Sequence, residues 1–168
     1  MRLFICEKPS QARDIARVLQ ASWRGDGYLQ GQNVTVTWCI GHLLETAPPE
    51  SYGDYKRWSL DDLPIIPDHW QLVVKPKVAS QLKVIDQLLQ RCAEVVIATD
   101  ADREGEMIAR EILERCQYQG PVLRLWLSAL DEARSAGPWP PCVRANRPCR
   151  CTTVHWPAPV PTGWWAST

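Results

Sequence analysis

Acidic side chains crowd the segment TDADREGE, residues 99 to 106, directly after the apolar run at residues 95 to 98. Carboxylates stand at every second position there, as Asp100, Asp102, Glu104 and Glu106. Carboxylates this close together repel one another unless a cation lies among them. Oxygen-only ligands favour a hard cation, and a few carboxylates with open water positions suit Mg²⁺ bound beside a phosphate. The run is therefore a candidate Mg²⁺ site for phosphate chemistry.

A second charged segment, EKPS at residues 7 to 10, follows the apolar run RLFIC. It adds the carboxylate of Glu7, while Lys8 and Arg103, each beside an acid, supply the positive groups that phosphate oxygens need. The competing interpretation is a solvated acidic turn that caps the next helix, whose dipole favours negative charge there. For the acidic run alone the two interpretations are balanced, and the Glu-Lys-Pro-Ser segment favours the metal site.

The elements that must position these side chains follow from the apolar pattern. Four runs rich in apolar and β-branched residues predict strands at residues 2–6, 33–40, 94–98 and 122–126. Apolar stripes at helical spacing predict three helices between them, the first capped by Ser10 and the third following the carboxylates. The inward faces of the second and third contain Leu82, Ile85, Leu89, Cys92, Ile108, Ile112 and Cys116.

Strands that alternate with helices predict an α/β fold with a doubly wound, largely parallel sheet. In such a sheet ligands bind outside the carboxyl ends of the strands. Glu7 leaves the first strand, and Asp100 and Asp102 leave a later one. Neighbouring strands would therefore bring these carboxylates into one pocket.

Composition narrows the classes of protein. A chain of 168 residues suits one ordinary domain, and its formal net charge of zero gives no global basic field, so a nucleic-acid partner must be bound locally. The seven cysteines are an odd number and no secretory signal precedes them, which predicts a reduced, cytoplasmic setting. No apolar run approaches the roughly 20 residues that cross a bilayer, so we expect no membrane span.

Two regions depart from the alternating pattern. Residues from about 22 to 77 hold five prolines and four tryptophans and are expected to form an insertion, part strand and part ordered loop, within a domain of residues 1 to 132. Residues 133 to 168 hold seven of the fourteen prolines and lack Leu, Ile, Met, Phe, Tyr, Lys, Asp, Glu and Gln. With so few aliphatic side chains to bury, this tail is expected to be disordered.

Four segments in this order resemble one known family. EKPS, VTWCIGHLLE, YKRWSLDDLPIIP and TDADREGE together look like the N-terminal Toprim domain of type IA DNA topoisomerases, specifically the bacterial and plasmid topoisomerase III branch. The likeness runs almost continuously from residue 1 to about residue 132. It implies a Rossmann-like Toprim fold, Mg²⁺ as cofactor, single-stranded DNA as partner and no nucleotide cofactor.

The resemblance also implies roles for single residues. It implies that Glu7 lies beside the scissile phosphate, that Lys8 holds this phosphate, that Asp100, Asp102 and Glu104 bind the metal, and that Trp58 contacts single-stranded DNA. The residue argument adds Glu7 to the metal ligands, Arg103 as a further catalytic cation, and Lys8, His42 and Arg57 to the expected DNA contacts. On the residues alone, Trp58 is better explained as a half-buried anchor of the insertion, although stacking on single-stranded DNA suits it too. A lone histidine after an apolar strand, such as His42, is more often a hydrogen-bonded structural residue, so it ranks below the carboxylates as a site residue.

The tail is explained by a shifted reading frame. Plausible GC-rich codons for residues 151 to 168, read from the third base of each codon, give a run ending in Asp-Trp-Leu-Val-Gly-Ile-Asn. That run resembles the family's segment leading out of the Toprim domain. If the family's sequence continues with a Leu codon, CTG, and then a codon beginning with A, the frame that encodes this chain meets the stop codon TGA directly after Thr168. We therefore expect a frameshift shortly after Glu132 and a truncated topoisomerase.

The expected activity follows from what is present. The family cleaves one DNA strand with a tyrosine of a later domain, and none of Tyr28, Tyr52, Tyr55 and Tyr118 matches that nucleophile. This chain alone is therefore expected to be inactive. The alternatives are a free-standing Toprim enzyme, an Mg²⁺-dependent nuclease or primase-like phosphotransferase, and a module that only binds single-stranded DNA or the full enzyme. The segments GHLLE and YKRWSLDDLP favour topoisomerase ancestry over the first alternative.

Overall fold

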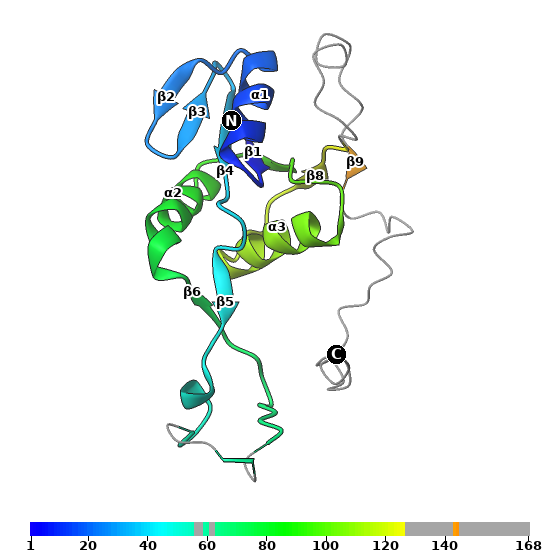
Figure 1. Cartoon of the computed structure of the whole chain (residues 1–168). Helices are drawn as coiled ribbons and strands as arrows, with labels where there is room; N and C mark the ends of the chain where they lie inside the picture. The colour runs from blue at the N-terminus through cyan, green and yellow to red at the C-terminus, as the bar shows by residue number, and fades with distance from the viewer. Residues whose placement is uncertain (56–58, 61–62, 127–142, 145–168) are drawn as a thin grey trace. The chain divides into compact units, whose positions relative to one another are not determined.

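The computed structural model describes residues 1–55, 59–60, 63–126 and 143–144 (Figure 1). These residues fall into two compact units, one built from the described residues of 1–44 and 74–144 and the other from the described residues of 45–73. Across the described residues, the helices are all too short or too polar to cross a membrane.

The first unit is organised around one sheet in the order β2-β3-β4-β1-β7-β8-β9. Its strands are β1 (Arg2–Cys6), β2 (Trp23–Gly25), β3 (Tyr28–Gln30), β4 (Val34–Trp38), β7 (Glu94–Ile97), β8 (Val122–Arg124) and β9 (Val143–Arg144). The four inner strands β4, β1, β7 and β8 are parallel, whereas β2, β3 and β9 pair antiparallel at the two sides. The four strands expected from the sequence are thus the four parallel ones.

Burial on both faces explains why β1 and β7 read as continuous apolar runs. Leu3 and Ile5 pack on one face of the sheet and Phe4 and Cys6 on the other, and these four side chains are at most 4% exposed. Strands of a parallel sheet that helices cover on both sides cannot alternate apolar with polar residues. This pattern confirms the predicted doubly wound, largely parallel sheet.

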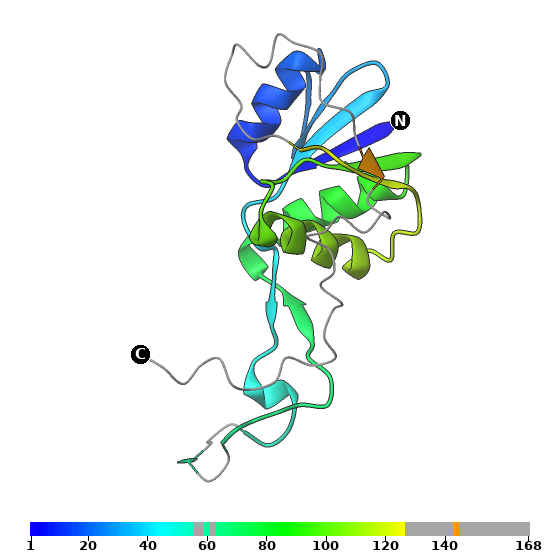
Figure 2. The ribbon, with the colours of Figure 1, turned by 90° about the vertical axis from the view of Figure 1, so that its right-hand side faces the viewer.

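Helices cover both faces of the sheet (Figure 2). Helix α1 (Pro9–Val18) packs on the face of Phe4, and helices α2 (Ala79–Leu89) and α3 (Arg103–Arg115) pack on the face of Leu3. Two short 3₁₀ helices, η1 (Pro49–Ser51) and η3 (Pro76–Val78), also occur among the described residues.

The predicted cap of the first helix is wrong. Lys8, not Ser10, is the N-cap residue of α1, and it makes no side-chain capping bond. Pro9 begins the helix because a proline at the first helical position lacks only an N–H that would have no partner, and its fixed φ already suits the helix. Ser10 therefore lies inside the first turn.

The described residues of the second unit lie between residues 45 and 73, within the expected insertion of about 22 to 77. Of the other residues in that range, those of β2, β3 and β4 belong to the main sheet. Strands β5 (Leu44–Thr46) and β6 (Leu72–Val74) pair in a separate two-stranded sheet. Beyond it, Tyr52 lies edge-on to Trp70 at 6.0 Å between ring centroids, and its hydroxyl accepts a hydrogen bond from the Gln71 N–H at 2.9 Å.

Two residues of the expected tail are described. Val143 and Arg144 form β9, which pairs antiparallel with β8, while the rest of residues 133 to 168 lies outside the described residues. An outer strand presents unpaired N–H and C=O groups that an extended segment can bond whatever its side chains are. The pairing therefore requires no apolar surface from the tail.

Removal of residues 133 to 168 is expected to lower the melting temperature by no more than about 4 °C, because the described contact is one short backbone pairing. Thermal unfolding followed by circular dichroism would measure the change. A control deletion that ends within β8 should abolish the cooperative transition. A fall of more than about 10 °C for the tail deletion would show that the tail packs on the domain.

Candidate functional site at the carboxyl ends of the parallel strands

The candidate site is built where the parallel strands end. The strand order places the carboxyl ends of β4, β1, β7 and β8 side by side, and the segments leaving them begin with Cys39, Glu7, Ala98 and Leu125. Backbone hydrogen bonds continue past the strands, from Cys39 N–H to the Cys6 carbonyl and from Ala98 N–H to the Ile5 carbonyl, both at 2.8 Å. Of the three carboxylates expected at this edge, Glu7 and Asp100 come within reach of one another, since the Asp100 N–H lies 3.4 Å from Glu7 Oε2.

Lys8 links the two carboxylates. Its Nζ lies 3.2 Å from Glu7 Oε1 and 3.1 Å from Asp100 Oδ2. Hydrogen bonds to Asp100 and then to Glu7 raise the pKa of the Lys8 ammonium, so the group stays protonated. Glu7 is nearly buried, with 9% of its side chain exposed, whereas 58% of the Lys8 side chain is exposed. The ammonium is therefore open to a ligand from solvent.

Gln11 holds both acidic segments from helix α1. Its Nε2 donates to Asp100 Oδ1 at 3.0 Å, and its Oε1 accepts from the Glu7 N–H at 2.9 Å. Nothing in the charge pattern of the sequence marked this residue. Its signal was positional, since a glutamine on the inward face of a helix needs partners for its amide.

Asp102 is occupied by helix α3. As the N-cap residue, it accepts a hydrogen bond through Oδ1 from the Gly105 N–H at 2.7 Å. This is the capping role of the competing interpretation, and Glu104 and Glu106 lie in the same acidic first turn. Capping uses one carboxylate oxygen of Asp102, so Oδ2 is not involved in it.

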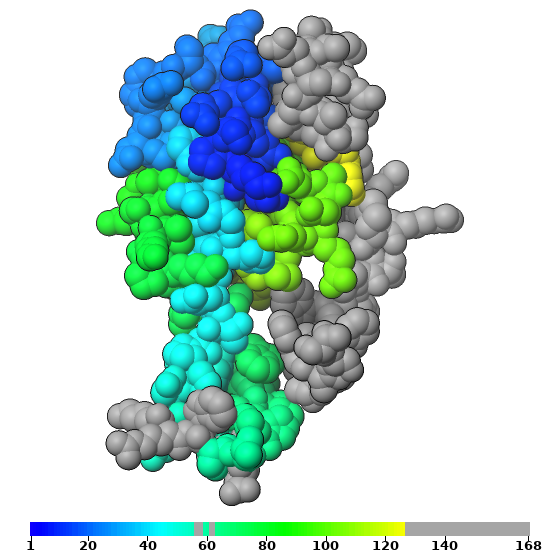
Figure 3. All heavy atoms as spheres, viewed as in Figure 1, coloured from blue at the N-terminus to red at the C-terminus, as the bar shows by residue number. Residues whose placement is uncertain are grey.

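Gly105 allows this turn to pack tightly. A Cβ at this position would lie 2.4 Å from the Asp100 carbonyl oxygen and 3.1 Å from Glu7 Oε2. Figure 3 shows the blue atoms of the N-terminal strand and helix against the yellow-green atoms of the segment that carries α3. The missing side chain is what lets α3 begin directly beside Glu7.

Arg124, which the sequence argument overlooked, holds the Asp100 segment from the other side. Its Nη2 donates to the Asp100 carbonyl at 2.6 Å, and its Nη1 donates to Thr99 Oγ1 at 2.7 Å. Thr99 in turn donates to the Gly105 carbonyl at 2.8 Å. The available signal was a cation inside the apolar strand VLRLW, because arginine is rarely buried without partners.

Burial gives Arg124 an unusual environment. Its side chain is 5% exposed, and its Nε is buried with no hydrogen-bond partner among the described residues. Desolvation lowers the pKa of the guanidinium, and Glu106, whose Oε2 lies 3.6 Å from Nη1, opposes that shift. The guanidinium also lies 5.4 Å from the centre of the Trp126 ring. The buried guanidinium of Arg124 therefore places a fixed positive charge against the segment of Thr99 and Asp100.

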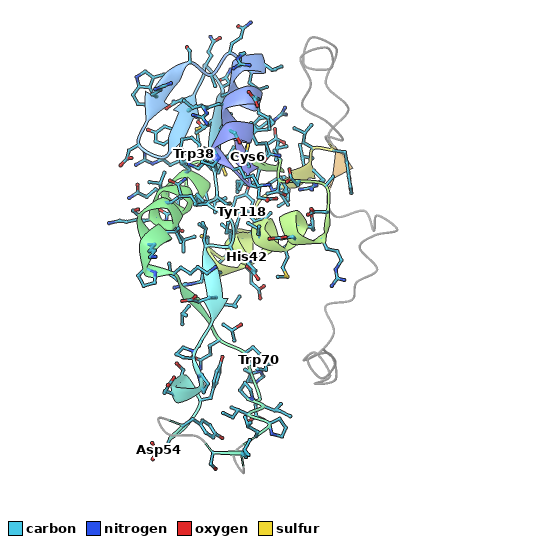
Figure 4. The ribbon with its side chains drawn as sticks, viewed as in Figure 1. Cys6, Trp38, His42, Asp54, Trp70 and Tyr118 are labelled. Atoms are coloured by element: carbon cyan, nitrogen blue, oxygen red, sulfur yellow. The ribbon has the colours of Figure 1, made fainter. Side chains whose placement is uncertain are left out.

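His42 enters the site from the end of β4. Its Nδ1 lies 3.2 Å from Glu111 Oε2, and its Nε2 lies 3.8 Å from Glu104 Oε1. Figure 4 shows the ring beside α3, which carries both glutamates. His42 thus lies at the edge of the acidic turn.

The other residues expected in the site do not form a metal-binding cluster among the described residues. Arg103 is exposed at the first position of α3, and Arg57 and Trp58 lie outside the described residues. Within the described part of the chain, no three His, Cys, Asp or Glu side chains are grouped closely enough to hold one metal ion. Asp102 caps α3, Glu104 faces His42, and Lys8 lies between the other two carboxylates, which accounts for that separation.

Two thiols close to the site are poor nucleophiles. Cys6 and Cys39 are fully buried. Desolvation, with a smaller contribution from Glu7, raises the pKa of Cys39 to about 12, and burial also raises the pKa of Cys6. Because the thiolate is the reactive form, the site does not offer cysteine chemistry near neutral pH.

Comparison with known families defines the class of protein. The Toprim domain family model matches residues 2–130, and the chain belongs to this family. The fold and the acidic strand ends described above are thus those of a Toprim domain.

The chain is similar to particular members. It is 49% identical over 131 residues to DNA topoisomerase 3 of Shouchella clausii (strain KSM-K16) and 47% identical to DNA topoisomerase 3 of Bacillus licheniformis. Each match covers 76% of this chain and 18% of the relative, so the chain spans less than a fifth of the length of these proteins. Full-length topoisomerase I from Thermotoga maritima shares the fold, with a TM-score of 0.54 and 20% identity over 79% of this chain and 19% of that one.

Gly105→Ala is expected to destabilise the domain by about 1–3 kcal/mol, because the new methyl group would overlap the backbone of Asp100. Urea unfolding would measure the loss. Glu114→Ala, at an exposed position on the same helix, is the matched control and should change stability by less than about 0.5 kcal/mol. Equal stability of Gly105→Ala and wild type would contradict the close approach of α3 to Glu7.

Proposed function

We propose that this domain binds Mg²⁺ and single-stranded DNA for strand cleavage and religation in a type IA DNA topoisomerase of the topoisomerase 3 kind. The observation that carries the proposal is the meeting of Glu7, Lys8 and Asp100 at neighbouring strand ends. Membership of the Toprim family and the similarity to DNA topoisomerase 3 proteins support it.

The donor set fits Mg²⁺. Glu7 and Asp100 present oxygen atoms only, and Mg²⁺ is commonly held by one or two carboxylates together with substrate phosphate. Glu7 and Asp100 would hold the ion, with Asp102 and Glu104 as further oxygen donors on the adjoining turn. The bound ion would neutralise charge on the phosphate and on its leaving oxygen.

The side chains around the proposed metal then have different roles in binding. A phosphate competes with Asp100 and Glu7 for the exposed ammonium of Lys8, which therefore turns from a neutralising partner of the carboxylates into a phosphate ligand. Arg103, exposed at the start of α3, is the second catalytic cation. Arg124 and Gln11 keep the Asp100 segment in place while this exchange occurs.

His42, Arg57 and Trp58 are proposed to contact the DNA strand. A tryptophan beside positive charges suits sequence-tolerant binding, because every base offers a face for stacking. The local character of these contacts agrees with a formal net charge of zero for the chain. The setting we propose is the reducing cytoplasm, which is supported by the free thiols of Cys6, Cys39, Cys92 and Cys116.

Residues 133 to 168 are proposed to be out-of-frame translation. The family model matches up to residue 130, and the DNA topoisomerase 3 relatives align over 131 residues, which supports a change of reading frame shortly after Glu132. The nucleotide sequence that follows the codon for Glu132 tests this directly. A coding sequence with no topoisomerase-like alternative frame would overturn it.

Calorimetric titration should show weak Mg²⁺ binding that Asp100→Ala with Asp102→Ala abolishes. Lys8→Gln should instead strengthen Mg²⁺ binding, because it removes the cation that now neutralises the two carboxylates. The same variant should weaken binding of a fluorescent single-stranded oligonucleotide, with Lys83→Gln on α2 as control. Equal Mg²⁺ binding by wild type and the double aspartate variant would exclude the site.

The chain by itself is expected neither to relax negatively supercoiled DNA nor to form a covalent DNA adduct in Mg²⁺, because metal and cations assist only a reaction that has a nucleophile. Gel electrophoresis would test both activities. Restoring the frame after Glu132 with the downstream domains should recover them. Nicking by the 168-residue chain that Asp100→Ala abolishes would instead favour a free-standing Toprim nuclease.

A further inference from the structure

Glu111 is a buried carboxylate that the proposed chemistry does not use. It lies in the third turn of α3 and is 9% exposed as a residue. Burying a carboxylate is unfavourable unless it is hydrogen-bonded or paired. Among the described residues, the contact that meets this need is His42, whose Nδ1 lies 3.2 Å from Oε2.

The helix places Glu111 and Glu104 on one side. The two residues are seven apart, which is close to two turns of an α-helix, so their side chains project in nearly the same direction. The His42 ring spans the interval, with Nδ1 toward Glu111 and Nε2 3.8 Å from Glu104 Oε1. The glutamates differ in exposure, since 10% of the Glu111 side chain and 68% of the Glu104 side chain is exposed.

A turn at Gly41 allows the backbone to bring His42 next to Glu104 and Glu111. Gly41 has φ +66°, in the left-handed region that residues with a Cβ rarely adopt, and no atom lies within 4 Å of a Cβ built there. The turn follows Cys39, which is bonded to the end of β1. His42 therefore enters the site from the same edge of the sheet as Glu7.

We propose that Glu111 is a positioning residue that fixes both the orientation and the tautomer of His42. An ionised carboxylate only accepts hydrogen bonds, so Nδ1 must carry the hydrogen that bonds Glu111. The bond holds the ring with its Nε2 edge toward Glu104 and the acidic turn. This inference rests on the proposed function for one point, that the Nε2 edge meets the DNA there.

The tautomer gives a readout that general loss of packing would not reproduce. Long-range ¹H–¹⁵N spectra of the imidazole distinguish hydrogen on Nδ1 from hydrogen on Nε2. In the free wild-type chain, His42 is expected to show the Nδ1–H form. Glu111→Leu should shift it toward the Nε2–H form, Glu111→Gln should restore the Nδ1–H form through its amide oxygen, and Glu114→Leu, exposed on the same helix, should leave it unchanged.

Binding of a fluorescent oligothymidylate in Mg²⁺ supplies the second readout. Glu111→Leu and His42→Ala should each weaken binding about threefold to tenfold, and the double variant should be no weaker than His42→Ala alone. Melting temperatures would confirm that the variants are folded. Additive losses, or the neutral tautomer with hydrogen on Nε2 alone in the folded wild type, would overturn the role of Glu111.

The two readouts separate the inference from the proposed function. Absence of oligonucleotide binding by the wild type would contradict the proposed function and the DNA contact of His42. The tautomer spectra, which need no DNA, would still decide whether Glu111 positions the ring. An Nδ1–H signal that survives Glu111→Leu in the folded chain would exclude that positioning.

Discussion

The shared ammonium of Lys8 is the interaction on which the candidate site depends. Parallel pairing of β1 with β7 forces the segments after them to run side by side, so Glu7 and Asp100 come close whatever their charge. Without a cation between them, the two carboxylates would repel and one would have to take up a proton or turn away. Lys8 removes that conflict through contacts of 3.1 and 3.2 Å, and it does so from an exposed position where it can be exchanged for another cation.

Two cations flank the acidic turn in different ways. Lys8 is flexible and open to solvent, whereas Arg124 is buried and has three of its contacts fixed by the backbone or side chains of the turn region. A planar guanidinium with several donors suits the fixed position, and a compact ammonium on a mobile stem suits the exchangeable one. Arg124 thus holds the acidic turn in place, whereas Lys8 can move away from it when another cation binds.

Sequence reasoning located the strands and their charged ends because those features are local. The buried runs at residues 2–6 and 94–98 and the acids after them can be recognised without knowing any partner. The roles of Gln11 and Arg124 could not be reached in this way, since each depends on a residue about 25 to 90 positions distant.

The sequence also could not decide between two possible roles of the same residue. Asp102 suits a helix cap and a metal ligand equally, and only the position of the Gly105 N–H shows that capping occupies it. Ser10 was misplaced because a serine and a neighbouring proline both mark helix starts, and the proline set the first turn. Glu104 was grouped with the other acids by spacing, whereas the nearby end of β4 brings His42 to it.

The central position of β1 has a consequence for synthesis on the ribosome. This strand is made first, yet one of its neighbours ends at residue 38 and the other at residue 97. Until the second neighbour emerges, a strand with four consecutive apolar residues, Leu3 to Cys6, keeps one edge and much of both faces exposed. Late closure of such pairings slows folding and favours aggregation of nascent chains. A pause in translation before β7 would therefore prolong the interval in which the chain needs a chaperone.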